Sequence, residues 1–164
     1  MARRTETTEY LKGCVADALI ELMETTPLEK IKVQDITDRA GVGRVTYFRY
    51  FESKTDILSF KLMTLWYSWI DKYPYPQRVG DYEHALWFFS FCYSIRPLLA
   101  ILLKQGKHII LLDVFLRCIT GIVPEAGRKR YLQMFTAFGL LGIVTEWIGS
   151  DFKETPEELA GLLL

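Results

Sequence analysis

The 164-residue chain suits one compact domain, or a small head joined to a larger body. Half of its residues are hydrophobic, which excludes a disordered chain, and its formal net charge of zero excludes a uniformly basic nucleic-acid-binding surface. Three widely spaced cysteines without CxxC spacing argue against a disulfide scaffold and favour a reducing, cytoplasmic setting. We expect no signal peptide, because the N-terminus runs directly into charged and polar residues.

Charges interrupt the long apolar stretches of the second half of the chain. Arg96 and Pro97 lie near the middle of residues 85–103, Asp113 interrupts 109–116, and Glu146 lies within 137–148. A membrane-spanning helix needs about 20 mostly uncharged residues. We therefore expect no membrane insertion.

Apolar residues recur at helical spacing along the whole chain, and no convincing strand alternation is present, so the pattern predicts an all-α protein. The first apolar stripe runs from Leu11 to Met23, and Thr26-Pro27 closes that helix. The further helices are expected at about 33–40, 44–51, 54–72, 81–94, 97–105, 107–121, 125–149 and 156–164.

Turn and capping residues separate these helices. Gly41-Val42-Gly43 predicts a tight turn, and Ser53 is placed to cap the helix that starts at Lys54. Pro97 is expected at the first position of its helix behind a Ser94 cap, and residues 155–158 form a capping box. Together these features predict a helix-turn-helix domain at residues 1–53 and a helical regulatory and dimerisation domain at residues 54–164.

Four ordered sequence blocks give the first helices a more specific meaning. They are Ile31–Ile36, Ala40–Val42, Thr46–Phe51 and Ser53–Lys54. In this order and spacing they resemble the DNA-binding domain of the TetR family of transcriptional regulators, over about residues 5–62. The resemblance implies a three-helix, N-terminal helix-turn-helix DNA-binding domain followed by a helical ligand-binding and dimerisation bundle.

Helical geometry assigns the faces of the recognition helix. Tyr47 and Phe51 share one face that should pack on the preceding helices, whereas Val45, Thr46 and Arg49 point the opposite way. Residues 39–54 carry four basic side chains against one acidic side chain, so positive charge gathers at this end. Together with the resemblance, this assigns contacts with double-stranded DNA to Lys32, Gln34, Arg44, Val45, Thr46, Phe48, Arg49, Tyr50 and Lys54.

Three positions depart from the family pattern. Phe48 stands where the family often has Tyr, Lys32 occupies the usual Thr cap position, and Gly43 replaces the usual Ser. The C-terminal part also resembles the subgroup that includes dihydroxyacetone-kinase regulators, in which a coactivator role exists. An alternative function is therefore a coactivator with a degenerate DNA-binding head that acts through a protein partner.

The resemblance implies a homodimer, because a palindromic operator presents two symmetric half-sites. The segment Tyr131–Ile148, followed by the helix at 156–164, is the best dimerisation candidate, with the alternative that the same face packs within the chain. The predicted interface residues are Phe135, Phe138, Gly139, Gly142 and Trp147.

A small-molecule effector would bind among aromatic residues of the body, although such a stripe is also typical of plain core. The candidate pocket residues are Trp66, Trp69, Trp87, Phe88, Phe91, Arg96 and Phe115, with Arg96 the candidate for an anion. His84 and His108 have no partner at catalytic or metal-ligand spacing, so no enzyme, metal site or cofactor is predicted. The expected function is a ligand-responsive repressor that binds a palindromic operator as a homodimer.

Overall fold

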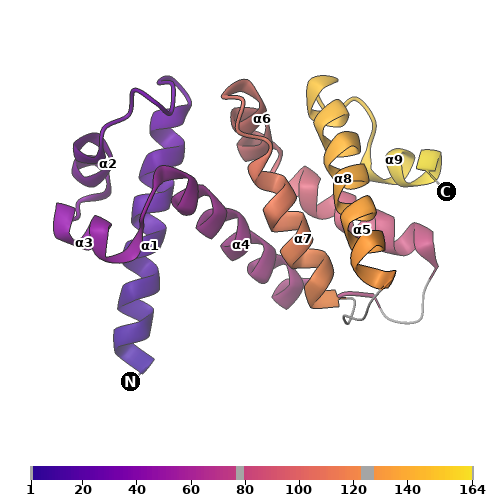
Figure 1. The fold of residues 1–164 in the computed structure, drawn as a ribbon, viewed down its shortest axis with the longest axis horizontal. Helices are drawn as coiled ribbons and strands as arrows, with labels where there is room; N and C mark the ends of the chain where they lie inside the picture. The colour runs from indigo at the N-terminus through magenta and orange to yellow at the C-terminus, as the bar shows by residue number, and fades with distance from the viewer. Residues whose placement is uncertain (1, 77–79, 123–127, 164) are drawn as a thin grey trace. The chain divides into compact units, whose positions relative to one another are not determined.

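A computed structural model describes residues 2–76, 80–122 and 128–163 (Figure 1). Every element of regular structure in these ranges is a helix, so the predicted all-α class is confirmed. The helices are α1 (Ala2–Met23), α2 (Val33–Ala40), α3 (Arg44–Tyr50), α4 (Lys54–Lys72), α5 (Asp81–Ser94), α6 (Arg96–Lys104), α7 (Ile110–Ile122), α8 (Arg128–Gly149) and α9 (Pro156–Leu163).

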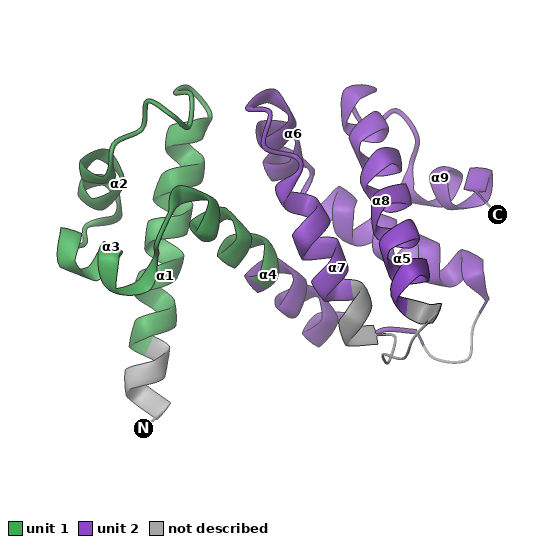
Figure 2. Cartoon of the chain, viewed as in Figure 1, with its two compact units in different colours: residues 1–63 green, residues 64–164 purple. Residues whose placement is uncertain are grey.

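The chain forms two compact units, residues 1–63 and 64–164 (Figure 2). Helix α4 runs across the division between them. A functional boundary between residues 53 and 54 stays a prediction.

The first unit is built around the apolar stripe of α1. Val15 and Leu19 of α1 and Ile36 of α2 have no exposed surface, and α1 packs against α2, which in turn contacts α3. Ion pairs on the surface join α1 to its neighbours, between Lys61 and Asp17 at 2.6 Å and between Arg39 and Glu21 at 2.8 Å. The burial of the stripe provides the main stabilisation, because exposed ion pairs contribute little.

The second unit buries large aromatic side chains between α5, α7 and α8. Phe89, Phe91, Phe115 and Trp147 are at most 2% exposed. Helix α5 packs against α9, and α7 packs against α8. The core of this unit therefore lies between helices from both halves of its sequence.

Two of the expected caps are confirmed by their hydrogen bonds. The Ser53 hydroxyl accepts from the Asp56 amide at 3.0 Å. The Thr155 hydroxyl accepts from the Glu158 amide at 3.2 Å, and the Glu158 carboxylate accepts from the Thr155 amide at 2.8 Å. Both helix starts thus satisfy amides that have no partner within the helix.

The predicted cap at Ser94 is wrong. Its hydroxyl donates to the Phe91 carbonyl at 2.7 Å. Helix α6 begins at Arg96, with Pro97 in its first turn, and the chain bends by 70° between α5 and α6. Helix α7 starts at Ile110 rather than near 107, because residues 107–110 form a turn in which the Ile110 amide donates to the Lys107 carbonyl at 3.1 Å. Residues 125–127, where the next helix was expected to start, lie outside the described residues.

Candidate nucleic-acid interface and apolar cavity

Helix α3 presents a mixed basic and apolar surface. Arg44, Val45, Phe48 and Arg49 are exposed, with Val45 at 73% and Phe48 at 60%, while Thr46 is half-buried. Large apolar side chains are unusual at such exposure beside arginines unless they meet a partner. The arginines can pair bidentately with guanine edges, and the apolar groups can contact thymine methyls.

The opposite face of α3 anchors it, as its periodicity predicts. Tyr47 and Phe51 are buried, and the Phe51 ring lies edge-on to Phe60 of α4, 5.6 Å between centroids. Burial, followed by the nearby Asp56 carboxylate, raises the pKa of the Tyr47 phenol. The exposed residues of α3 therefore lie on a helix that is held in place by its buried face, as sequence-specific contacts with DNA require.

The turn between α2 and α3 depends on Gly41. This residue has φ +65°, a conformation that glycine adopts without the steric cost paid by other residues. The amide of Val42 then donates to the Thr37 carbonyl at 3.1 Å, which closes the end of α2. The turn sets the direction in which α3 leaves.

Lys32 and Gln34 are exposed at the start of α2. The Lys32 amide donates to the Asp35 carboxylate at 2.8 Å, so one half of a capping box is present; a lysine side chain cannot accept the reciprocal bond. The Gln34 amide group donates to Asp38 at 2.5 Å. Gln34 would have to exchange that bond for one to a base.

Lys54 is already engaged within the first unit. Its ammonium donates to the carbonyl of Leu28 and, at 3.0 Å, to the carbonyl of Ile31. An ammonium has three donors, so one remains for the phosphate contact that the sequence predicts. The structure gives Lys54 a positioning role, since it ties the segment before α2 to the start of α4.

Not every basic side chain counted in residues 39–54 adds positive charge to this surface without an acidic partner. Arg39 pairs with Glu21 of α1 at 2.8 Å. Among the described residues, by contrast, no carboxylate pairs with Arg44 or Arg49. Tyr50 is half-buried, and its hydroxyl lies 3.5 Å from that of Thr8, at the edge of the surface.

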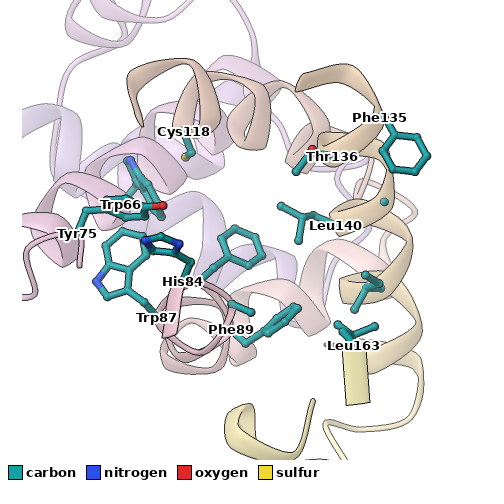
Figure 3. Close-up of a pocket in the computed structure, with 14 residues that line it drawn as sticks. Trp66, Tyr75, His84, Trp87, Phe89, Cys118, Phe135, Thr136, Leu140 and Leu163 are labelled. Carbon is teal, nitrogen blue, oxygen red and sulfur yellow. The ribbon is translucent and has the colours of Figure 1, made fainter. Parts of the chain in front are cut away.

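The second unit contains a cavity of about 540 Å³ (Figure 3). This volume lies within the usual range for small-molecule sites, roughly 300–1,000 Å³. Its wall is aromatic and aliphatic, and no Asp, Glu, Lys or Arg belongs to it in the described part of the chain. Its lining includes Trp66, Tyr75, Ala85, Thr136, Leu140 and Ile143.

The cavity's polar groups are few. The Tyr75 and His84 rings stack 4.9 Å apart, and His84 Nε2 lies 3.2 Å from the Pro76 carbonyl. The Trp87 indole donates to the Tyr73 carbonyl at 2.9 Å. Burial, and to a smaller degree Asp81, raises the pKa of the Tyr75 phenol, which therefore stays neutral at physiological pH.

Only part of the predicted pocket lies at this cavity. Trp66, Trp87 and Phe88 line it. Phe91 and Phe115 are core residues, and Trp69 packs on Phe91 behind the lining. Arg96 is exposed, and its guanidinium lies 4.4 Å from the centre of the Tyr93 ring, so the structure gives it a surface position rather than an anion site in the cavity.

Helix α8 carries an exposed apolar stripe. Tyr131 (80% exposed), Phe135 (79%) and Phe138 recur at helical spacing with Gly139 and Gly142, and we call these five residues the α8 stripe. A Cβ added at either glycine would meet nothing within 4 Å. A glycine inside a helix costs about 0.5–1 kcal/mol relative to alanine, so packing within the chain gives no reason for these two.

Trp147 does not belong to that stripe, contrary to the prediction. It is 2% exposed, and its indole donates to the Glu154 carbonyl at 2.9 Å. Its ring also packs on Phe152, with 5.1 Å between centroids. Trp147 faces the core because it lies on the opposite side of α8 from Phe138 and Gly142.

Helix α8 is also long and apolar enough, over Arg130–Gly149, to cross a membrane. One third of that window is buried inside the fold, and core helices of soluble proteins pass the same test. The bent pair α5–α6 passes it only when taken as one span. These features are weak evidence for a membrane.

Two family models match the chain. The model of bacterial regulatory proteins of the tetR family matches residues 15–59, which contain the helix-turn-helix described above. The model of a transcriptional regulator C-terminal region matches residues 103–164. The chain belongs to the TetR family.

Two solved structures of transcriptional regulators share this fold. The fatty acid degradation regulator FadR from Bacillus halodurans is 18% identical, with a TM-score of 0.56 over 93% of this chain and 91% of that one. The transcriptional regulator FadR from Bacillus subtilis, solved in complex with stearoyl-CoA, is 23% identical, with a TM-score of 0.52 over 91% of each chain. A comparison with curated proteins finds no match.

For this TetR-family regulator, sequence reasoning missed several cavity residues. Tyr75, Thr136, Cys118 and Leu163 line the cavity but are scattered over four segments. No periodicity in one helix could have grouped them.

The described part of the chain holds no cluster of three or more His, Cys, Asp or Glu that could bind a metal.

Proposed function

We propose that this TetR-family regulator binds a palindromic operator as a homodimer and represses transcription by covering a promoter. The observation that carries the proposal is the exposed surface of α3, where Arg44 and Arg49 flank Val45 and Phe48 over a buried Tyr47 anchor. The seven residues of α3 can contact only a few base pairs. Sequence-specific binding therefore calls for two heads.

The α8 stripe supports a second copy of the chain as the partner. Its aromatic side chains are uncharged, and its two glycines leave room for another helix to approach closely. A two-fold interface of this kind is self-complementary, because each copy offers the same patch. Leu162 and Leu163 of α9 add exposed apolar surface at the C-terminal end of the same unit.

The cavity supports an effector role for an apolar ligand. The complex of B. subtilis FadR with stearoyl-CoA makes an acyl chain one candidate. The lining seen here suits an alkyl or aromatic group. Ligand binding would release DNA through a different affinity for two arrangements of the heads.

The test compares arginine variants on a duplex selected by the protein. Arg44→Ala or Arg49→Ala should lose about 1–3 kcal/mol of discrimination between the selected and a scrambled duplex. Arg117→Ala is the matched control, since it removes the same charge from an exposed pair with Asp113 in the second unit. Equal losses for all three variants would refute reading by α3.

A coactivator with a degenerate head makes a different prediction. Such a protein would bind no duplex selectively, and its association with a partner would be insensitive to salt, unlike phosphate contacts. If the wild-type protein binds no duplex selectively, so that the arginine variants have no DNA binding to lose, the result favours this alternative.

A further inference from the structure

The cavity and the α8 stripe share residues. Phe135 and Gly139 belong to the stripe, and both also line the cavity. Leu163 of α9, which is 44% exposed, lines it as well. The surface on which a second copy would dock therefore reaches the wall of the cavity.

The helical geometry of α8 explains this overlap. With 100° per residue, the α8 residues that line the cavity are centred roughly 90° around the helix from the centre of the stripe. They lie between the stripe and the buried side that carries Ala137, Val144 and Trp147. The cavity thus runs along the edge of the stripe.

The two sides of the cavity differ in how well the chain covers them. Trp66 and Cys118 are buried on one side (Figure 3). On the side of α8 and α9, Phe135, Gly139 and Leu163 remain exposed, and Figure 3 shows Phe135 and Leu163 across the cavity from Trp66. The single chain leaves this side open.

We propose that a second copy of the chain closes the cavity, so that an uncharged apolar ligand binds the dimer more tightly than the monomer. The inference rests on the proposed homodimer and adds the ligand class and the means of regulation. The open Cβ position of Gly139, at the edge of the cavity, admits a partner helix there. Because linkage is reciprocal, the ligand must then strengthen dimerisation by the factor by which dimerisation strengthens its binding.

The lining determines the ligand class. Its described side chains are aromatic or aliphatic, apart from hydroxyls at Tyr75 and Thr136, the His84 ring and the Cys118 thiol. A carboxylate placed among them would lose its hydration without gaining a cation, whereas a hydroxyl needs only one hydrogen bond. 1-Decanol and decanoate form a matched pair of probes, with the same carbon number and different charge.

The experiment measures dimer dissociation of the full chain by sedimentation, with and without each probe, at pH 8. 1-Decanol should lower the dimer dissociation constant by about fivefold or more, the lower end of typical coupling between sites, and decanoate should leave it unchanged. Ala85→Phe, which fills the cavity from α5, should dimerise like the wild type but lose the response. Gly142→Trp blocks the stripe without touching the lining, and should weaken calorimetric binding of 1-decanol by a similar factor.

The possible failures are distinguishable. A dimer whose dissociation constant is unaffected by 1-decanol, or is lowered equally by decanoate, overturns the inference and leaves the homodimer standing. A chain that stays monomeric with and without 1-decanol overturns the homodimer and the inference with it.

Discussion

Replacing Lys54 tests whether it holds the DNA-binding head together. Its ammonium donates to the carbonyls of Leu28 and Ile31, in the segment that leads into α2. A hydrogen bond to a charged group contributes about 1.5–3 kcal/mol, and the two bonds share one donor group. Lys54→Met keeps the alkyl stem and should lower the free energy of unfolding by about 2–4 kcal/mol.

The assay is urea unfolding followed by two signals. Circular dichroism reports the unfolding of helices in both units. Tryptophan fluorescence reports the second unit, because all four tryptophans lie there, at 66, 69, 87 and 147. Hydrogen exchange of peptides covering α2 should locate the loss in the first unit. The control Lys30→Met removes an exposed lysine from the same segment and should change stability by less than about 0.5 kcal/mol. Equal stability of the two variants would refute the positioning role of Lys54.

Three further predictions concern other parts of the fold. Gly41→Ala should destabilise the first unit by about 1–2 kcal/mol, because a Cβ is strained at φ +65°. Gly13→Ala, inside α1, should stabilise the same unit by about 0.5–1 kcal/mol. Denaturant titration measures both changes in the free energy of unfolding. Burial raises the pKa of the Cys118 thiol from 9.0 to about 12. At pH 8, iodoacetamide should therefore label this thiol in the folded protein about a thousandfold more slowly than in the urea-unfolded protein. The contribution of the buried, neutral thiol to stability should be lost as the pH rises from 9 towards 12. Trp147→Phe should cost about 1–3 kcal/mol in thermal unfolding, because it leaves the Glu154 carbonyl without its donor; an unchanged melting temperature would contradict that role.

Local features of the sequence predicted much of the first unit. Helical periodicity located α2 and α4 to the residue, and the chemistry of Ser53 and Gly41 predicted a cap and a turn that the structure contains. The buried positions of Tyr47 and Phe51 followed from 100° per residue alone. These features could be predicted because they depend on residues a few positions apart.

Features that depend on distant partners could not be predicted in the same way. The sequence shows Trp147 and Phe138 as one apolar segment, but only packing decides that Trp147 faces Phe152 and Phe138 faces outwards. Lys54 bonds to carbonyls more than twenty positions away, which no local pattern encodes. Arg96 was a candidate for an anion site, but the Tyr93 ring holds it at the surface.

Selection of bound duplexes from a random DNA library tests the central proposal most directly. The account predicts a palindromic motif, with half-site centres about 34–36 Å apart or a multiple of one helical turn, and affinity that falls steeply with rising salt. Absence of any enriched motif, from protein shown to be folded and dimeric, would contradict it and would favour a regulator that acts through a protein partner.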